Sequence, residues 1–258
     1  MSTSKPKPIA PRVRNAEATR GAILEHAIAE FAAQGVAGAR TAAIAEAAGV
    51  NKALLYYYFK DKDSLYSAAL QAVFSGLVED VLPLLESSLS PGEKLLRFAR
   101  VHFEYLIKHP DYPRLIQQEL SRACITGESS RDFRAISTAH FLPLRQAGLK
   151  VVADGIGCGE FRKVEGAGVL SAVVGMNVFY FNSAPIMRMV RGVDPLSPEC
   201  IRGHIATALD FIGAALFTDR EYGIRLAKKI SAAPSALPRE LRGKGPHVTE
   251  GKRATHEC

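Results

Sequence analysis

The chain has 258 residues, of which 47% are apolar, and a formal net charge of +7. This length and composition allow a substantial core in one large or two small domains. The four cysteines, Cys124, Cys158, Cys200 and Cys258, include no C-x-x-C pair, which argues against a disulfide scaffold or a zinc site and fits a reducing cytoplasm. We find no run of about 18 apolar residues and no secretory signal, so we expect a cytosolic protein with no membrane partner.

The positive charge is concentrated at the two ends of the chain. Residues 1–20 hold five basic side chains and one acidic one, and residues 228–258 hold seven and three, so each end carries +4 and the body 7 − 8 = −1. The ends are rich in Pro, Gly and Ser, and we expect disorder over residues 1–16 and 223–258. Such basic arms often touch phosphate backbones, although a solvated tail that aids solubility is an equally good interpretation.

Between the ends, the first clear helical pattern is ATRGAILEHAIAEFAAQG, residues 18–35. Its apolar residues recur at spacings of three and four from Ile23 to Phe31, which is typical of an amphipathic helix. Gly35 is free to take a positive φ and is the predicted end of this helix. Thr41 is the predicted N-cap of a short second helix over residues 42–48.

A tight turn separates the second predicted helix from a third. Gly49 and Val50 form the turn, and Asn51 is the predicted N-cap of the third helix. Val50 and Leu55 occupy the two positions of a hydrophobic staple. Asp61 is the predicted N-cap of a fourth helix. Two short helices joined by such a turn form a helix-turn-helix, whose second helix can enter the major groove of DNA.

After the fourth helix, which we expect to run toward Pro83, further stretches have helical periodicity and are bounded by Pro, Gly or Asp. These stretches are residues 91–109, 112–123, 130–157, 165–182 and 197–217. No alternating stretch is bounded by hairpin signals. We therefore predict an all-α protein, with an N-terminal three-helix helix-turn-helix head on a larger helical domain.

Three tyrosines and a phenylalanine stand in a row near the end of the third predicted helix. Four consecutive rings point around the whole helix, so at least one or two must face outward. Phe59 lies four residues after Leu55, and we expect this pair to hold the helix to the core of the head. Tyr56 and Tyr57 are predicted to face outward, where a phenol suits a phosphate contact. Tyr58 stays ambiguous, and the alternative is that all three tyrosines are packing.

The start of the third helix is suited to approach DNA bases. Lys52 and Ala53 leave room for the backbone to come close, and the apolar side chain of Leu54 can read a thymine methyl. Lys62 stands in the first turn of the fourth helix, where free backbone N–H groups and the helix dipole favour an anion. A DNA phosphate is such an anion.

Residues 19–65 resemble the DNA-binding head of the tetracycline-repressor (TetR) family of transcriptional regulators. The resemblance rests on TR..IL..A...FA..G in the first helix, on AGV at the turn, and on NK.LLYYYFKDKDSL from the third helix into the fourth. It implies that Thr41, Tyr56, Tyr57 and Lys62 contact the DNA backbone, with the start of the third helix nearest the bases. The predicted DNA-binding residues are Thr41, Asn51, Lys52, Ala53, Leu54, Tyr56, Tyr57 and Lys62.

The chain departs from the family pattern at the start of this helix. Family members often have Gly-Thr where this chain has Ala53 and Leu54, and Ser where it has Asn51. Leu54 lacks the hydroxyl of the usual threonine. We therefore expect an apolar contact with a base at position 54 in place of a hydrogen bond. The resemblance places the DNA-binding domain at residues 17–63, with its motif at about 40–59.

The resemblance also implies that residues 64–222 form a ligand-binding and dimerisation domain. An apolar stripe on the last strong helix, with small residues such as Gly203, Ala206, Gly213 and Ala214 on its other faces, suits a close contact between subunits. The stripe comprises Ile201, Ile205, Ala208, Leu209, Ile212 and Leu216. With residues 166–182 it is expected to build a four-helix dimer interface, and simple internal core is the alternative.

Aromatic and soft residues in the body are the candidates for a small-molecule pocket. They are Phe98, His102, Tyr105, Phe133, Phe141, Met176, Phe179 and Tyr180. The alternative is that they are core residues, because aromatic stripes at helical spacing are usually packing. For His102 in particular, a satisfied interior histidine is the competing interpretation.

No catalytic signature accompanies these features. The glycines of GIGCGE, residues 155–160, lack the spacing of a dinucleotide fingerprint and predict a turn after a helix, and no basic residue flanks Cys158 closely. We therefore expect no enzyme, cofactor or metal. The predicted function is a homodimeric repressor that binds a near-palindromic double-stranded operator and is released by a small-molecule effector. The alternatives are an activator, a ligand-independent regulator, or a helical carrier or enzyme.

Overall fold

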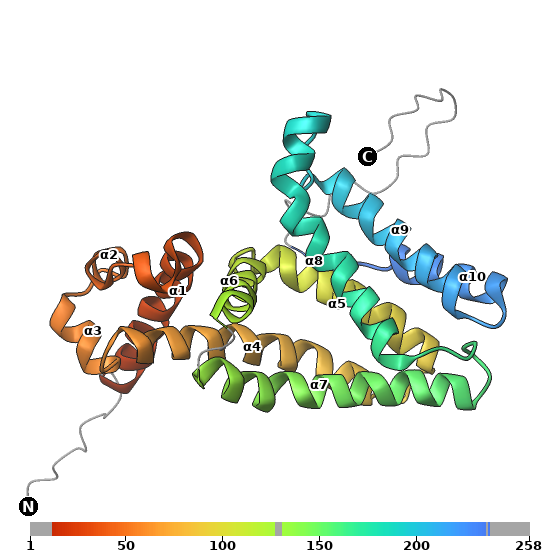
Figure 1. Ribbon diagram of the computed structural model, residues 1–258, viewed down its shortest axis with the longest axis horizontal. Helices are drawn as coiled ribbons and strands as arrows, with labels where there is room; N and C mark the ends of the chain where they lie inside the picture. The colour runs from red at the N-terminus through yellow and green to blue at the C-terminus, as the bar shows by residue number, and fades with distance from the viewer. Residues whose placement is uncertain (1–11, 127–130, 236, 238–258) are drawn as a thin grey trace, which may run out of the picture. The chain divides into compact units, whose positions relative to one another are not determined.

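The structure, a computed structural model, describes residues 12–126, 131–235 and 237. These residues form ten helices and no β-strand, with one isolated antiparallel bridge between Phe161 and Phe217 (Figure 1). The all-α prediction is confirmed. The helices are α1 (Arg12–Gly38), α2 (Thr41–Ala47), α3 (Lys52–Tyr58), α4 (Lys62–Glu86), α5 (Pro91–Lys108), α6 (Asp111–Thr126), α7 (Arg131–Gly157), α8 (Gly166–Arg191), α9 (Pro198–Leu216) and α10 (Arg220–Ala232).

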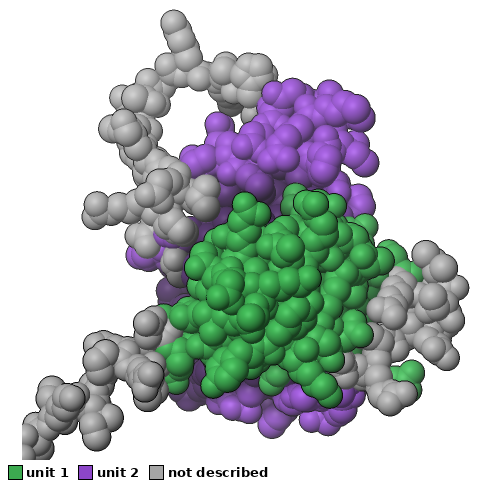
Figure 2. Space-filling view, turned by 90° about the vertical axis from the view of Figure 1, so that its left-hand side faces the viewer, with its two compact units in different colours: residues 1–73, 114–134 green, residues 74–113, 135–258 purple. Residues whose placement is uncertain are grey.

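The chain divides into two compact units, which Figure 2 shows in separate colours. Unit 1 comprises residues 1–73 and 114–134, and unit 2 comprises residues 74–113 and 135–258. Unit 1 therefore contains α1, α2, α3 and the first half of α4, together with most of α6. α4, α6 and α7 each contribute residues to both units.

Unit 1 is built around the predicted helix-turn-helix. Gly35 takes a φ of +67° and interrupts the regular helix of α1, as predicted. Asn51 caps α3 by accepting a hydrogen bond from Leu54 N at 2.7 Å, and Asp61 caps α4 by accepting one from Ser64 N at 2.7 Å. Both predicted caps are confirmed. The side chains of α1 to α4 that fill the core of this unit include Ile23, Phe31, Ile44, Leu55, Phe59 and Leu65.

The predicted cap at Thr41 is wrong. α2 begins at Thr41 itself, and its N-cap residue is Arg40, whose side chain makes no capping hydrogen bond. The Arg40 backbone N–H donates instead to the Glu30 carboxylate on α1 at 3.0 Å. This contact satisfies one of the free N–H groups at the start of α2 and leaves the Thr41 hydroxyl available for another partner.

Unit 2 is held together by α5, α8, α9 and α10. The small faces of α9 and α10 meet at Gly213 and Gly223, where a Cβ on Gly213 would lie 2.5 Å from the Gly223 carbonyl oxygen. Glycine is required at this crossing, because any side chain would push the two backbones apart. α10 is capped by Asp219, which accepts a hydrogen bond from Tyr222 N at 2.9 Å.

The ordered structure extends into both ends that were predicted to be disordered. α1 begins at Arg12 rather than after residue 16, and α10 lies largely within the predicted tail from residue 223. α10 forms because its residues Gly223, Leu226, Ala227 and Ile230 make a buried stripe at helical spacing. The rest of the two predicted arms, residues 1–11, 236 and 238–258, lies outside the described residues.

Two described helices, α4 and α8, are long and apolar enough to span a membrane by length and composition alone. The sequence expectation concerned a continuous run of about 18 apolar residues, and neither helix contains one. The apolar residues are interrupted by single polar ones, such as Asn177 and Asn182 in α8, so no continuous run is visible in the sequence. Within the chain, 39% of the most apolar stretch of α4 is buried and only 17% of that of α8.

Candidate nucleic-acid interface

The recognition helix α3 turns one side into the head and the other outward. Leu55 and the C-cap residue Phe59 are buried, which confirms that this pair holds the helix to the core. Tyr57 is 80% exposed and Tyr56 is 39% exposed, so both face solvent as predicted. Tyr58 is half-buried, and its ring lies edge-on to that of Tyr57 at 5.4 Å.

The start of α3 presents small or flexible side chains outward. Lys52 and Ala53 are exposed, and Leu54 is half-buried. The Asn51 side chain is exposed, but its oxygen is engaged with Leu54 N. Its amide nitrogen therefore remains the group of this side chain that suits a contact with an acceptor on DNA.

Two of the predicted phosphate-contacting residues, Thr41 and Tyr56, lie in contact although they belong to different helices. The Thr41 hydroxyl at the start of α2 and the Tyr56 hydroxyl on α3 are 3.1 Å apart. The Lys52 ammonium lies over the Tyr56 ring, 5.8 Å from its centroid. A cation and two hydroxyls on one exposed surface are suited to bind phosphate oxygens.

Lys62 has a partner within the head. Its ammonium donates to the Ala37 carbonyl oxygen near the end of α1 at 3.1 Å. An ammonium group has three donors, so this bond leaves capacity for a phosphate while holding the side chain against α1.

Sequence reasoning missed two charged residues of the head. Arg20 on α1 is exposed, and its guanidinium lies over the Phe59 ring at 5.2 Å. Glu30 supports the start of α2 through Arg40 N. Both contacts join residues ten or more positions apart, and no local pattern signals them.

The predicted pocket residues are spread over both units and over buried and exposed positions. Phe133 belongs to unit 1, and Phe179 on α8 is 71% exposed and points outward. Tyr105 packs edge-to-face with Tyr112 at 5.8 Å, and the Phe141 ring lies 4.4 Å from that of Phe74.

Four of the predicted pocket residues, Phe98, His102, Met176 and Tyr180, belong to α5 and α8. His102 is buried, and its ring lies 5.9 Å from that of Phe98. Tyr180 lies 4.2 Å from the His204 ring and donates to the Pro195 carbonyl oxygen at 2.6 Å. Met176 on α8 is half-buried.

The buried amide of Asn177 joins two histidines, His102 and His204. Its Nδ2 donates to the Ala99 carbonyl at 2.8 Å and lies 3.2 Å from His102 Nδ1, and its Oδ1 lies 3.2 Å from His204 Nε2. Burial disfavours the charged imidazolium and lowers the pKa of both His102 and His204 to about 4. Two neutral imidazoles linked by an amide fit a satisfied interior network, and Asn177 was absent from the predicted set.

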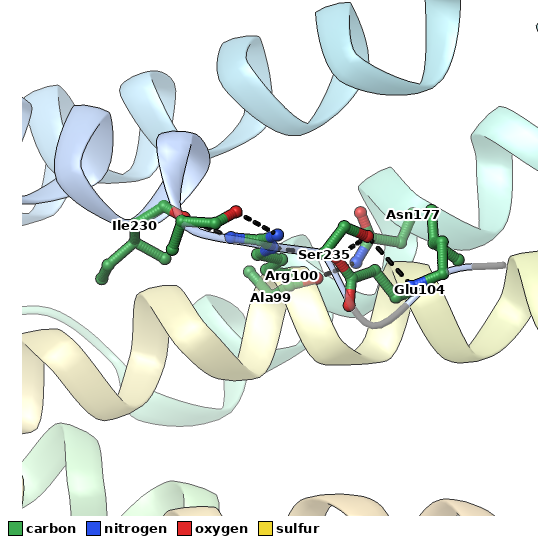
Figure 3. A network of polar contacts seen from close by, with 8 residues as sticks. Ala99, Arg100, Glu104, Asn177, Ile230 and Ser235 are labelled. Atoms are coloured by element: carbon green, nitrogen blue, oxygen red, sulfur yellow. Dashed lines mark hydrogen bonds and ion pairs between the residues drawn. The ribbon is translucent and has the colours of Figure 1, made fainter. Parts of the chain in front are cut away.

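A buried ion pair near this network fixes the end of α10. Arg100 Nε donates to Glu104 at 2.9 Å, and the same guanidinium donates to the carbonyls of Ile230 and Ala233 (Figure 3). Ser235 donates to the Glu104 carboxylate at 2.9 Å. These contacts explain why an ordered segment continues beyond α10.

The predicted dimer stripe on α9 faces the interior of unit 2. All six residues, Ile201, Ile205, Ala208, Leu209, Ile212 and Leu216, are buried within the chain itself. Their burial favours the alternative of internal core over a contact with a partner subunit. The large apolar side chains that α8 and α9 expose are instead Phe179, Ile186, Met189, Val190 and Phe211.

The glycine-rich stretch GIGCGE, residues 155–160, lies at the end of α7. α7 ends at Gly157, and Gly159 takes a φ of +80°, so GIGCGE forms the predicted turn after a helix. Glu160 in this turn accepts a hydrogen bond from Gly92 N at 2.9 Å and so supports the start of α5. Among the residues with described positions, no group of three or more His, Cys, Asp or Glu side chains is arranged to hold a metal ion.

An exposed recognition helix behind a Gly turn, with hydroxyls and a lysine beside it, defines a helix-turn-helix DNA-binding protein. Comparison with known families agrees with this class. The family described as "Bacterial regulatory proteins, tetR family" matches residues 23–69, and "Tetracyclin repressor-like, C-terminal domain" matches residues 91–212. The chain belongs to the TetR family of transcriptional regulators, whose members bind DNA and are not enzymes.

Individual relatives extend the similarity beyond the head. The chain is 25% identical over 126 residues to the HTH-type transcriptional repressor NicS of Pseudomonas putida, covering 49% of this chain and 59% of that protein. It is 29% identical over 138 residues to the HTH-type transcriptional regulator RutR of Escherichia coli, covering 53% and 65%. The matches thus span less than two thirds of the length of either relative.

Solved structures share the fold. A transcriptional regulator from Saccharomonospora viridis in complex with choline superposes with a TM-score of 0.62 at 17% identity, covering 78% of this chain and 98% of that one. At this identity the similarity is one of fold. It agrees with a helix-turn-helix head followed by a helical C-terminal domain.

Proposed function

We propose that this protein is a homodimeric repressor that binds a near-palindromic operator and is released from it by a small-molecule ligand. The observation that carries the proposal is the exposed surface of Thr41, Tyr56 and Tyr57 beside the slender start of α3. Hydroxyls at its edge are placed to bind phosphates, and Lys52, Ala53 and Leu54 approach the base edges. Asn51 and Lys62 complete the proposed set of contacts.

Repression is favoured over activation by the relatives. NicS is named a transcriptional repressor, and the region similar to it covers 49% of this chain. An activator or a ligand-independent regulator of the same fold is the alternative. The position of the operator relative to a promoter distinguishes a repressor from an activator, because a repressor site overlaps the region that polymerase must occupy.

Dimerisation is favoured by the length of the recognition helix. α3 has only seven residues, and one such helix contacts too few base pairs for an operator to be selected from a genome. The exposed apolar side chains of α8, with Phe179 and Ile186 seven residues apart on one side of the helix, suit burial against a second copy of this chain. Phe211 on α9 is a further exposed ring, 64% accessible.

Release by a ligand is favoured by the S. viridis relative of the same fold, which binds choline. In this chain the ligand is expected to act on the helical C-terminal domain and to shift the population toward an arrangement of heads that no longer matches the operator. A coupling free energy of about 1–3 kcal/mol is enough to change DNA affinity by about 5–150-fold. Membership in a family of soluble regulators favours a cytoplasmic location.

Selection of bound duplexes from a random DNA pool tests this function. Purified full-length protein is incubated with the pool, the bound duplexes are amplified, and enriched sequences are read after several rounds. An enriched inverted repeat supports a dimeric sequence reader. If the recovered DNA shows no enriched sequence and its binding is lost as the salt concentration is raised, sequence-specific binding by the ligand-free protein is contradicted.

A further inference from the structure

Two adjacent side chains of α6 bond to two different helices of the DNA-binding head within unit 1. Gln118 Nε2 donates to the Ala32 carbonyl oxygen on α1 at 3.0 Å. Glu119 accepts a hydrogen bond from the Tyr66 hydroxyl on α4 at 2.6 Å. We refer to Gln118, Glu119 and Tyr66 as the α6 latch.

The Gln118 contact lies where α1 loses its regular geometry. Ala32 is three residues before Gly35, whose φ of +67° interrupts the helix. Carbonyls in the last turn before such a break lack the usual partner four residues later, and a side-chain donor can satisfy them. The amide oxygen of Gln118 lies 4.0 Å from the position of a Cβ on Gly35, so the side chain packs against the break.

The Glu119 contact is buried. Glu119 is only 1% exposed, and the Tyr66 ring packs edge-to-face on Phe31 of α1 at 5.0 Å. A hydrogen bond to a carboxylate is stronger than one between neutral groups, and a buried acceptor that loses its donor is costly. The contact therefore strongly favours one position of α6 against α1 and α4.

We propose that the α6 latch positions α1 and α4, and with them the recognition helix α3, for binding to the operator. α3 follows these helices because Phe59 at its end is buried in the same core and lies under Arg20 of α1. Tyr66 and Glu119 are buried, so they influence DNA through geometry and not through contact. The inference rests on the proposed DNA-binding function.

The test compares full-length variants on the operator obtained by selection. Fluorescence anisotropy gives the Kd of the wild type, Tyr66→Phe, Glu119→Gln and Gln118→Ala at several salt concentrations, at a temperature where circular dichroism shows each one folded. Gln117→Ala is the matched control, because Gln117 is the neighbouring and exposed glutamine of α6. We expect Tyr66→Phe, which loses a buried hydrogen bond, to weaken operator binding about tenfold, and Gln118→Ala, which loses a part-buried one, to weaken it about threefold or more.

Two further readouts separate a positioning role from others. The slope of log Kd against log salt stays at the wild-type value in the latch variants, because no phosphate contact is lost. Adding Glu119→Gln to Tyr66→Phe weakens binding by less than the two single changes added together, because both changes remove the same hydrogen bond. Wild-type affinity in folded Tyr66→Phe and Gln118→Ala would overturn the latch proposal, and so would a reduced salt slope.

The wild-type arm keeps the two proposals distinguishable. If the wild type selects and binds an operator and the latch variants bind it equally well, the latch proposal is overturned and the proposed function stands. A wild type that binds no duplex above background overturns the DNA-binding function and the latch with it. Where Tyr66→Phe fails to fold, Gln118→Ala and its Gln117→Ala control decide the question.

Discussion

The Thr41 and Tyr56 hydroxyls, on the two helices of the helix-turn-helix, lie 3.1 Å apart. Either oxygen can donate, so the pair keeps one hydroxyl hydrogen free for an acceptor outside the protein. The contact holds the Tyr56 ring near the start of α2, where free backbone N–H groups also favour an anion. The pair thus links α2 and α3 into one surface for a DNA phosphate.

Removing the Tyr56 hydroxyl is expected to weaken operator binding. Tyr56→Phe keeps the ring and deletes one hydrogen-bonding group, so we expect an increase in Kd of about 2–10-fold, equally for matched and scrambled duplexes. Titration of both duplexes by fluorescence anisotropy checks this. Tyr58→Phe is the matched control, because Tyr58 is half-buried on the same helix; an equal loss in that variant would argue against a specific role for Tyr56.

Lys62→Ala is expected to weaken binding to all DNA sequences alike and to reduce the salt slope by about one, because a phosphate contact is lost. The contact of its ammonium with the Ala37 carbonyl at 3.1 Å adds a second consequence, a lower free energy of unfolding. Salt titrations and denaturant unfolding measure the two effects separately. A changed sequence preference with an unchanged slope would contradict a phosphate role for Lys62.

The two histidines linked by Asn177 are expected to make unfolding sensitive to acid. Burial lowers the pKa of both histidines from the ordinary value of 6.5 to about 4, so below pH 6.5 the unfolded chain binds protons that the native one does not. Stability is therefore full above pH 6.5 and is lost as pH falls toward 4, by about 3 kcal/mol for each histidine.

Urea unfolding at pH 7, 6 and 5 checks this acid sensitivity. His102→Gln and His204→Gln should each flatten the fall in stability between pH 6.5 and 5, although each variant is less stable at pH 7 because the network around Asn177 is disturbed. A burial-lowered pKa at His109 adds to the fall in the wild type and is retained in both variants. A pH dependence equal to that of the wild type in both would show that these imidazoles are not the groups responsible.

The exposed ring of Phe179 gives a test of dimerisation. Phe179→Asp introduces a charge on the outward side of α8 and is expected to convert the dimer to monomers, because an unpaired charge is costly at a buried interface. Analytical ultracentrifugation reports the mass. Leu142→Asp, on an exposed position of α7, is the matched control and should remain dimeric; a Phe179→Asp dimer as tight as the wild type would place the interface elsewhere.

The head could be predicted almost completely from the sequence because its signals are local. The positive φ at Gly35 and the caps at Asn51 and Asp61 depend on residues within a few positions of one another. Thr41 was misjudged because the group that supports the start of α2 is Glu30, on another helix. Long-range partners of this kind leave no trace in a short window of sequence.

The body was predicted less well because an apolar stripe does not reveal what covers it. The stripe on α9 has the composition of an interface, yet all of its residues are buried within the chain. α10 itself was missed because Lys228 and Lys229 were counted with the charged tail. Asn177 was overlooked because a lone amide in an apolar helix has meaning only once the two histidines beside it are known.

The most direct measurement of the central claim is a hydroxyl-radical footprint of the protein on a selected duplex, with the mass of the complex determined in parallel. Two α3 helices in a symmetric dimer should protect two inverted half-sites about one helical turn, or a multiple of it, apart. We predict this pattern with an even number of chains on each duplex. Protection of a single site by one chain, or uniform protection along the duplex, would contradict the account of a dimeric sequence reader.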